Sequence, residues 1–303
     1  MMRSLRGRST VTAMLAAVSL AVLIPGTTAV ADPAGGTTLV VLGDSFTATA
    51  PVLGHADDGC TRSPSSWPNQ LAAATQPAGT AQFLDVSCNG GTIDTGNGWT
   101  LVHQARKAFA QGGFGPDTRV VLIQAGLNDV WGNSTGTAFP STDCLLNIVV
   151  GCGFDAADQN RLPDYRAVTG SGYADRVREV VTFVRYYAPK ARVALVGYPE
   201  VFPAGQSTAC MDLAVAGRVV QPRAEGYIAY LDRVQDAQRT AAGLLGIEFV
   251  DLRAVTTGHA SCSDDPWISG LAGADSPFDG APVHPNARGN GVVADRMRQQ
   301  FGL

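Results

Sequence analysis

Residues 37–45 of this 303-residue chain read TTLVVLGDS, an apolar, β-branched run that ends in a glycine and two polar residues. The run does not alternate between apolar and polar side chains, which is typical of a strand buried on both faces. Four similar runs follow at 82–86, 119–123, 192–196 and 248–252. We therefore predict a first strand at 37–42 and a central sheet of five strands.

Segments of helical character separate these strands. In the clearest one, 172–188, valine and tyrosine side chains recur at helical spacing, and the segment stops before Pro189. The other helices are expected at 67–74, 98–110, 226–245 and 286–301. Strands that alternate with helices predict an α/β fold in which a parallel sheet is covered on both faces. We expect a single domain over residues 32–303.

Three loop-rich stretches interrupt the alternation, at 132–170, 197–221 and 259–282. Loops this long in a compact domain usually carry function. In an open parallel sheet they lie near the carboxyl ends of the strands, where ligands bind. We therefore expect the functional site at that edge of the sheet.

The first 31 residues have the layout of a secretory signal peptide. Three arginines precede an apolar run at 11–24, and Ala29, Val30 and Ala31 form a small-residue cleavage signal. A transmembrane anchor is less favoured, because the run is shorter than the roughly 20 apolar residues that a span needs. We expect cleavage after Ala31 and a secreted, extracellular protein.

Charge and cysteine content narrow the function further. The formal net charge is −4, from 22 basic and 26 acidic side chains, which excludes the basic surface of a nucleic-acid-binding protein. An exported chain folds in an oxidising compartment, so its 6 cysteines are expected to form disulfides. Their spacings match no zinc site, and no other cluster suggests a metal. Sequence alone leaves the pairing open, and sequential pairing closes the shortest loops.

Four short motifs place polar groups at the expected site. Ser45 directly follows the first strand, and Gly90 lies in SCNGGT (87–92) after the second. Asn128 lies in GLND (126–129) after the third strand, and His284 lies in VHPN (283–286) before the last helix. Each motif alone also fits a structural role, as a turn, an Asx turn or a helix cap.

Taken together, these residue types suit nucleophilic catalysis. A serine hydroxyl can attack a carbonyl carbon once a histidine accepts its proton. A glycine N–H and an asparagine amide can donate hydrogen bonds to a developing oxyanion. The proline and asparagine after His284 fit a helix start, which would fix the position of the imidazole.

In their order and placement, the four motifs resemble the sequence blocks of the SGNH (GDSL) hydrolase family. The resemblance spans the chain from Leu39 to the last helix. It implies an ester hydrolase on a flavodoxin-like, three-layer α/β/α fold that needs no metal or organic cofactor. Ser45 would be the nucleophile and His284 its base, and the N–H groups of Ser45 and Gly90 with the Asn128 side chain would form the oxyanion hole.

The cysteine layout also looks like that of the secreted bacterial esterases and lipases of this family. That likeness implies three sequential disulfides, Cys60–Cys88, Cys144–Cys152 and Cys210–Cys262. One position departs from the family pattern, because the aspartate that usually orients the histidine is replaced here by Ala281. Either a backbone carbonyl near Ala281 accepts the imidazole N–H, which we favour, or the Asp279 carboxylate does so.

Two substrate classes and one non-catalytic role fit the loops. A carboxylesterase or lipase is favoured by apolar residues in the stretch 132–170, namely Phe139, Leu145, Leu146, Ile148, Val149, Val150 and Phe154, although ordinary packing also explains them. A carbohydrate acetylesterase could instead use Trp99, Trp131 and Trp267 as sugar platforms. A non-catalytic extracellular binding module is the third reading. We expect a monomer that binds a small-molecule or lipid ester, with no nucleic acid and no stable membrane insertion.

Overall fold

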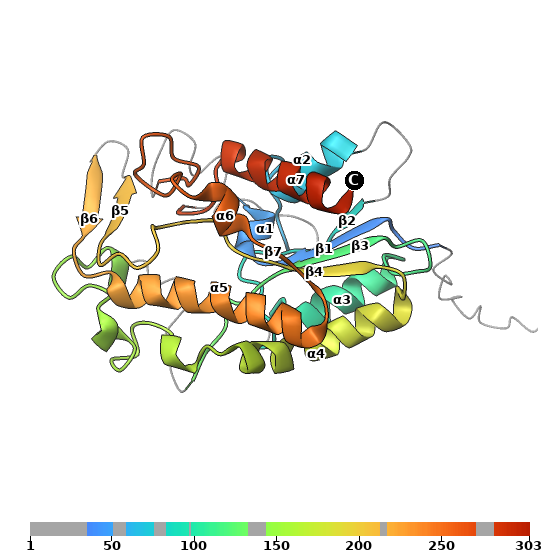
Figure 1. The fold of residues 1–303 in the computed structure, drawn as a ribbon, viewed down its shortest axis with the longest axis horizontal. Helices are drawn as coiled ribbons and strands as arrows, with labels where there is room; N and C mark the ends of the chain where they lie inside the picture. Colours follow the sequence, from blue (N-terminus) through green and yellow to red (C-terminus); the bar gives the residue numbers. More distant parts are fainter. Residues whose placement is uncertain are drawn as a thin grey trace, which may run out of the picture. The chain divides into compact units, whose positions relative to one another are not determined.

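The computed structural model describes residues 35–50, 59–75, 83–96, 98–132, 144–212, 217–270 and 282–303. Its central sheet has five parallel strands in the order β2-β1-β3-β4-β7 (Figure 1). These strands are β1 (Leu39–Gly43), β2 (Phe83–Asp85), β3 (Val120–Gln124), β4 (Arg192–Val196) and β7 (Glu248–Val250). The predicted five-stranded parallel sheet is therefore confirmed.

Five long helices lie where the sequence indicates them. They are α2 (Trp67–Thr75), α3 (Leu101–Ala110), α4 (Gly170–Tyr187), α5 (Glu225–Leu245) and α7 (Ala287–Phe301). Side chains fix two of the starts, because Thr169 accepts a hydrogen bond from Gly172 N–H and Asn286 accepts one from Gly289 N–H. In the described ranges, no helix combines the length and apolar character needed to cross a membrane.

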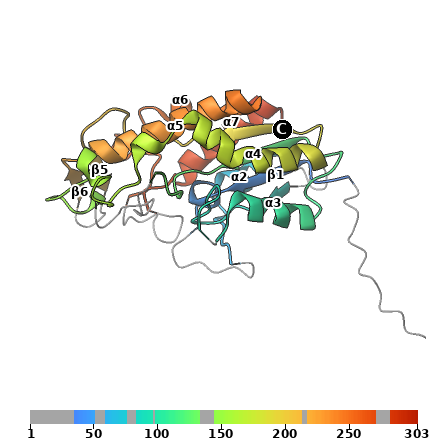
Figure 2. The same cartoon turned by 90° about the horizontal axis from the view of Figure 1, so that it is seen from below.

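Helices cover both faces of the sheet, which explains why its strands do not alternate. Every residue of β1 and β3 is buried. Val40 and Leu42 belong to a core shared with α3, α4 and α5, whereas Leu39 and Val41 belong to a second core shared with α2 and α7. Figures 1 and 2 show these helices on opposite sides of the sheet, as expected of a three-layer α/β/α fold.

Several short elements were not predicted. The chain forms the short helices α1 (Ser45–Ala48) and α6 (Leu252–Thr256), and an antiparallel hairpin of β5 (Ala209–Asp212) and β6 (Arg218–Gln221) within a stretch expected to be loop. The last sheet strand was expected to run to residue 252. It ends at Val250 because the Asp251 side chain accepts a hydrogen bond from Ala254 N–H and starts α6.

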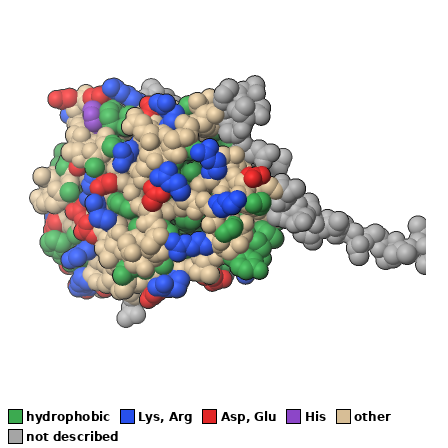
Figure 3. All heavy atoms as spheres, turned by 45° about the vertical axis from the view of Figure 1, so that its right-hand side comes forward, with side chains coloured by type: hydrophobic (Ala, Val, Ile, Leu, Met, Phe, Trp, Pro, Cys, Tyr) green, Lys and Arg blue, Asp and Glu red, His purple; other side chains and the backbone are tan. Residues whose placement is uncertain are grey.

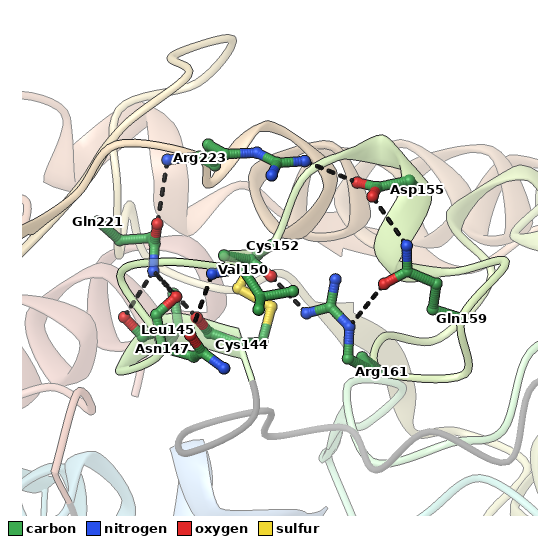
Figure 4. Close-up of a disulfide and its surroundings, with 11 residues drawn as sticks. Cys144, Leu145, Asn147, Val150, Cys152, Asp155, Gln159, Arg161, Gln221 and Arg223 are labelled. Atoms are coloured by element: carbon green, nitrogen blue, oxygen red, sulfur yellow. Dashed lines mark hydrogen bonds and ion pairs between the residues drawn. A yellow bond between two sulfur atoms is a disulfide. The ribbon is translucent and has the colours of Figure 1, made fainter.

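Three disulfides connect the loops at the carboxyl edge of the sheet. They join Cys60 to Cys88, Cys144 to Cys152, and Cys210 to Cys262. The first connects the residues before α2 to the turn after β2. The second closes a small loop between β3 and α4 (Figure 4), and the third connects β5 to the loop before α7.

Candidate active site

Ser45 lies at a tight turn between β1 and α1. The backbone of Gly43 is held on both sides by the Gln104 side chain, whose Oε1 accepts from Gly43 N–H at 2.8 Å and whose Nε2 donates to Gly43 O at 3.0 Å. A Cβ on Gly43 would lie 2.2 Å from Thr47 Oγ1, so the close return of the chain requires glycine here. This turn leaves Ser45 half-buried at the carboxyl edge of the sheet.

His284 reaches Ser45 from the start of α7. Its Nε2 is 2.7 Å from Ser45 Oγ, and its Nδ1 is 2.7 Å from the carbonyl oxygen of Pro282. A carbonyl can only accept, so Nδ1 carries the proton and Nε2 is free to accept the serine proton. The group that accepts the imidazole N–H is therefore a backbone carbonyl, and it belongs to Pro282. Ala281 and Asp279 lie outside the described residues.

The imidazole of His284 is almost fully buried, with 5% of its surface exposed. Burial lowers the pKa of His284 to about 4, and the hydrogen bond with the Pro282 carbonyl opposes this shift. The ring is therefore neutral near pH 7. A neutral imidazole whose Nε2 carries no proton is the form that can act as a general base.

A neighbouring loop holds the His284 segment, which we define as residues 282–286. Val283 N–H donates to Ser269 O at 3.1 Å, and Ser269 N–H donates to His284 O at 2.8 Å. Asn286 N–H donates to Trp267 O at 2.9 Å. Val283 has a φ of +61°, which a β-branched residue rarely adopts. Backbone strain beside a candidate base is typical of functional sites.

Three further groups at this edge can donate hydrogen bonds. The N–H groups of Ser45 and Gly90 have no protein acceptor among the described residues. Gly90 is exposed, with a φ of +74°, and its loop lies against β1, because Cys88 N–H donates to Gly43 O at 3.1 Å. Asn128 Nδ2 donates to Gly91 O at 2.9 Å, which leaves its second hydrogen for another acceptor.

Sequence reasoning missed the buried pair Asp44 and Tyr198. Asp44 Oδ1 accepts from Phe46 N–H at 2.8 Å, and Asp44 Oδ2 accepts from the Tyr198 hydroxyl at 2.5 Å. Burial raises the pKa of Asp44 to about 7, and these hydrogen bonds partly oppose the rise. Tyr198 Oη also accepts from Leu127 N–H at 3.3 Å. The pair therefore joins the Ser45 turn to the residue before Asn128.

A second unforeseen group, Asp129, joins the Gly90 loop to the Asn128 turn. Its buried carboxylate accepts from Ile93 N–H at 2.9 Å and from Arg176 Nη2 at 2.5 Å. Arg176 also pairs with Asp94. The only available signal was its place after Asn128, which equally fits an Asx turn. Asp129 therefore fixes the position of the turn that carries Gly90 relative to the turn that carries Asn128.

Of the three tryptophans proposed as sugar platforms, Trp131 is buried, and Trp99 and Trp267 are half-buried. Trp131 is buried between Tyr173 and Arg176. Trp267 stacks on His259 with ring centres 3.5 Å apart, and the Lys107 ammonium lies 4.6 Å from the ring centre of Trp99. Among the residues described, no group of three His, Cys, Asp or Glu side chains could hold a metal ion. The arrangement is instead suited to acyl transfer through a serine.

Comparison with known proteins agrees with this chemistry. The profile of the GDSL-like Lipase/Acylhydrolase family matches residues 41–292. The chain is similar to "Lipase 2" of Streptomyces coelicolor, with 32% identity over 98% of this chain and 98% of that protein. It is also similar to "Lipase 1" of the same organism, with 28% identity over 95% of each.

Solved structures share the fold. The phospholipase A1 from Streptomyces albidoflavus aligns with a TM-score of 0.57 and 24% identity, covering 87% of this chain and 99% of its own. The extracellular lipase from Streptomyces rimosus aligns with a TM-score of 0.57 and 20% identity, with the same coverage of 87% and 99%. The chain therefore belongs to the GDSL-like Lipase/Acylhydrolase family, and it is a carboxylic ester hydrolase.

Proposed function

We propose that the protein is a secreted serine esterase or lipase that cleaves acyl esters through an acyl-enzyme on Ser45. The observation that carries this proposal is the 2.7 Å distance between Ser45 Oγ and His284 Nε2, with Nδ1 hydrogen-bonded to a carbonyl. In the first step, Ser45 Oγ attacks the carbonyl carbon of the ester and its proton moves to His284 Nε2. The imidazolium then returns this proton to the leaving alcohol.

Charge on the tetrahedral intermediate is stabilised by the N–H groups of Ser45 and Gly90 and by the Asn128 side chain. A water molecule then attacks the acyl carbon while His284 takes its proton, and His284 returns this proton to Ser45 Oγ as the acid leaves. The Pro282 carbonyl orients the imidazole and stabilises the imidazolium that forms in both steps. In this role the Pro282 carbonyl takes the place of the aspartate carboxylate in a Ser-His-Asp triad.

The proposed substrates are lipid esters in the extracellular medium. The names of the relatives, two lipases and a phospholipase A1, support a lipid substrate, and the disulfides support export. The exposed apolar side chains of the stretch 146–154 also support a lipid over a sugar ester. We further propose that residues 1–31 are a signal peptide cleaved after Ala31, and that the rest is a monomeric single domain.

Hydrolysis of p-nitrophenyl esters of increasing chain length, by the wild type and by Ser45→Ala, tests this function. We expect activity that rises beyond the acetyl ester and is lost in Ser45→Ala. A serine-directed phosphonate should label Ser45 in the wild type. An optimum at the acetyl ester would favour an acetylesterase, and no turnover with no labelling would favour a binding module.

A further inference from the structure

An uncharged stretch of eleven residues, 144–154, forms the disulfide loop between β3 and α4. The described residues expose nine large apolar side chains, and five of them lie in this stretch: Leu146, Ile148, Val149, Val150 and Phe154. We call these five side chains the 146–154 patch. Val149 is the most exposed, at 82%. Figure 3 shows a contrasting face, on which basic and acidic side chains are interspersed.

Four backbone carbonyls near the base of this loop have hydrogen-bond partners within the protein. Gln221 Nε2 lies within 3.2 Å of the carbonyl oxygens of Cys144, Leu145 and Asn147 (Figure 4). Arg161 Nη1 donates to Gly151 O at 2.5 Å. These carbonyls need no water as a partner. Each carbonyl paired in this way lowers the cost of bringing the loop to an apolar medium.

The base of the loop is packed tightly, so the patch is held outward. Leu145 is buried in the core, and Gly226 N–H at the start of α5 donates to Cys152 O at 2.9 Å. A Cβ on Gly226 would lie 2.4 Å from Gly153 O, which shows how closely α5 approaches the loop. With its base fixed in this way, the patch stays exposed to solvent unless something outside the described residues covers it.

Size and charge indicate what could cover it. A stable protein interface needs about 20–30 residues a side, far more than these five side chains offer. The charged neighbours balance, because Arg161 and Arg223 contribute two positive charges and Asp155 and Glu225 contribute two negative ones. The surroundings therefore favour neither an anionic nor a cationic partner. A small apolar projection with balanced charge fits insertion into the interfacial region of an uncharged or zwitterionic lipid surface.

We propose that the 146–154 patch docks the enzyme on such a lipid surface and so turns the carboxyl edge of the sheet toward the ester substrate. The loop follows the carboxyl end of β3, the edge of the sheet where Ser45 lies. Figure 1 shows the loop and the start of α5 at this end of the sheet. This inference rests on the proposed function, because it assumes that the ester is presented in a lipid assembly.

Binding to phosphatidylcholine vesicles tests the proposal without catalysis. The Ser45→Ala protein is sedimented with the vesicles, with and without the double change Ile148→Asp and Val149→Asp. Loss of two inserted apolar side chains should lower the partition coefficient more than about tenfold. The matched control is Leu244→Asp, because Leu244 is 59% exposed on α5, outside the patch, against 55% for Ile148. Its partition coefficient should not change.

Any one of four results would overturn the proposal. The first is no binding of the Ser45→Ala protein to the vesicles, and the second is equal binding by the double variant. The third is binding to phosphatidylglycerol vesicles alone that disappears at high salt, which would assign the docking to charge. A dimer seen by sedimentation velocity and abolished in the double variant would instead make a second copy the occupant and would also overturn it.

Hydrolysis assays keep this proposal separate from the proposed function. In an otherwise wild-type chain, the double variant should hydrolyse a soluble short-chain ester with unchanged kcat/KM. On phosphatidylcholine vesicles its rate should fall about tenfold, in line with the lost partitioning. A wild type that binds vesicles but hydrolyses no ester would contradict the proposed function alone. Equal losses on soluble and vesicle substrates would contradict docking by the patch.

Discussion

The Ser45 turn, residues 43–49, continues directly from the central sheet, whereas the His284 segment lies outside the sheet and pairs with a neighbouring loop. Gly43 belongs to β1, is aligned with Gln124 of β3 and is bound on both sides by Gln104. The His284 segment is joined by hydrogen bonds to residues 266–269, and Val283, at a positive φ, is buried in the core.

This difference has a consequence for mutants. A side chain added at Gly43 would disturb β1 and the packing of the core, so stability and activity should fall together. A change confined to the His284 side chain leaves the sheet intact, so activity should fall alone. Activity and unfolding, measured on the same variants, therefore distinguish the two regions.

The largest effect is expected for His284→Gln. Glutamine fits the space but cannot act as a base, so kcat should fall by about 10⁴-fold or more. The melting temperature should change little. The matched control is His259→Gln, because His259 stacks on Trp267 beside the same loop and does not contact Ser45. Loss of less than tenfold in kcat for His284→Gln would contradict the assigned role.

Asn128→Ala should have the next largest effect. Removal of one oxyanion donor typically costs about 2.7–4 kcal/mol of transition-state stabilisation, a fall of roughly 10²–10³-fold in kcat. KM should change little, because the donor acts on charge that develops in the transition state. The lost bond to Gly91 O lowers stability slightly, which urea unfolding measures. A rise in KM with unchanged kcat would assign Asn128 to substrate binding instead.

The parts of this fold that follow from local pattern were predicted correctly. Runs such as 119–123 lack alternation because helices cover both faces, and parallel strands bring their carboxyl ends to one edge. That edge is why Ser45, Gly90 and Asn128 could be grouped from the sequence. The roles of these residues stay predictions until the variants are measured.

The contacts that depend on the tertiary structure were not foreseen. Nothing local marks Tyr198 as the partner of Asp44, because they lie 154 positions apart and meet only when β1 and β4 enter one sheet. The hydrogen bond between Pro282 and His284 depends on the positive φ of Val283, which no propensity favours. The short helix α6 was missed because a single N-cap residue, Asp251, determines where it begins.

Asp44→Asn tests how the buried carboxyl group of Asp44, in the Ser45 turn, makes stability depend on pH. Burial raises the pKa of Asp44 from 3.8 to about 7. Between these values the folded state binds more protons than the unfolded state, so the wild type loses stability as pH rises. The asparagine variant lacks this dependence. We expect its free energy of unfolding, relative to wild type, to rise by a few kcal/mol from pH 4 to pH 7. A flat difference in urea unfolding would contradict a raised pKa.

The smallest effect is expected for Gly90→Ala, with Gly96→Ala as its control. Both glycines are exposed, with φ of +74° and +77°, and an added Cβ would meet nothing within 4 Å at either. Each change should therefore cost only about 1 kcal/mol of stability from the positive φ. Of these two glycines, only Gly90 presents its N–H to the proposed oxyanion. Gly90→Ala should therefore lower kcat by a few-fold, whereas Gly96→Ala should leave kcat unchanged. Equal kcat in the two variants would remove Gly90 from the oxyanion hole and leave Ser45 and Asn128 as its donors.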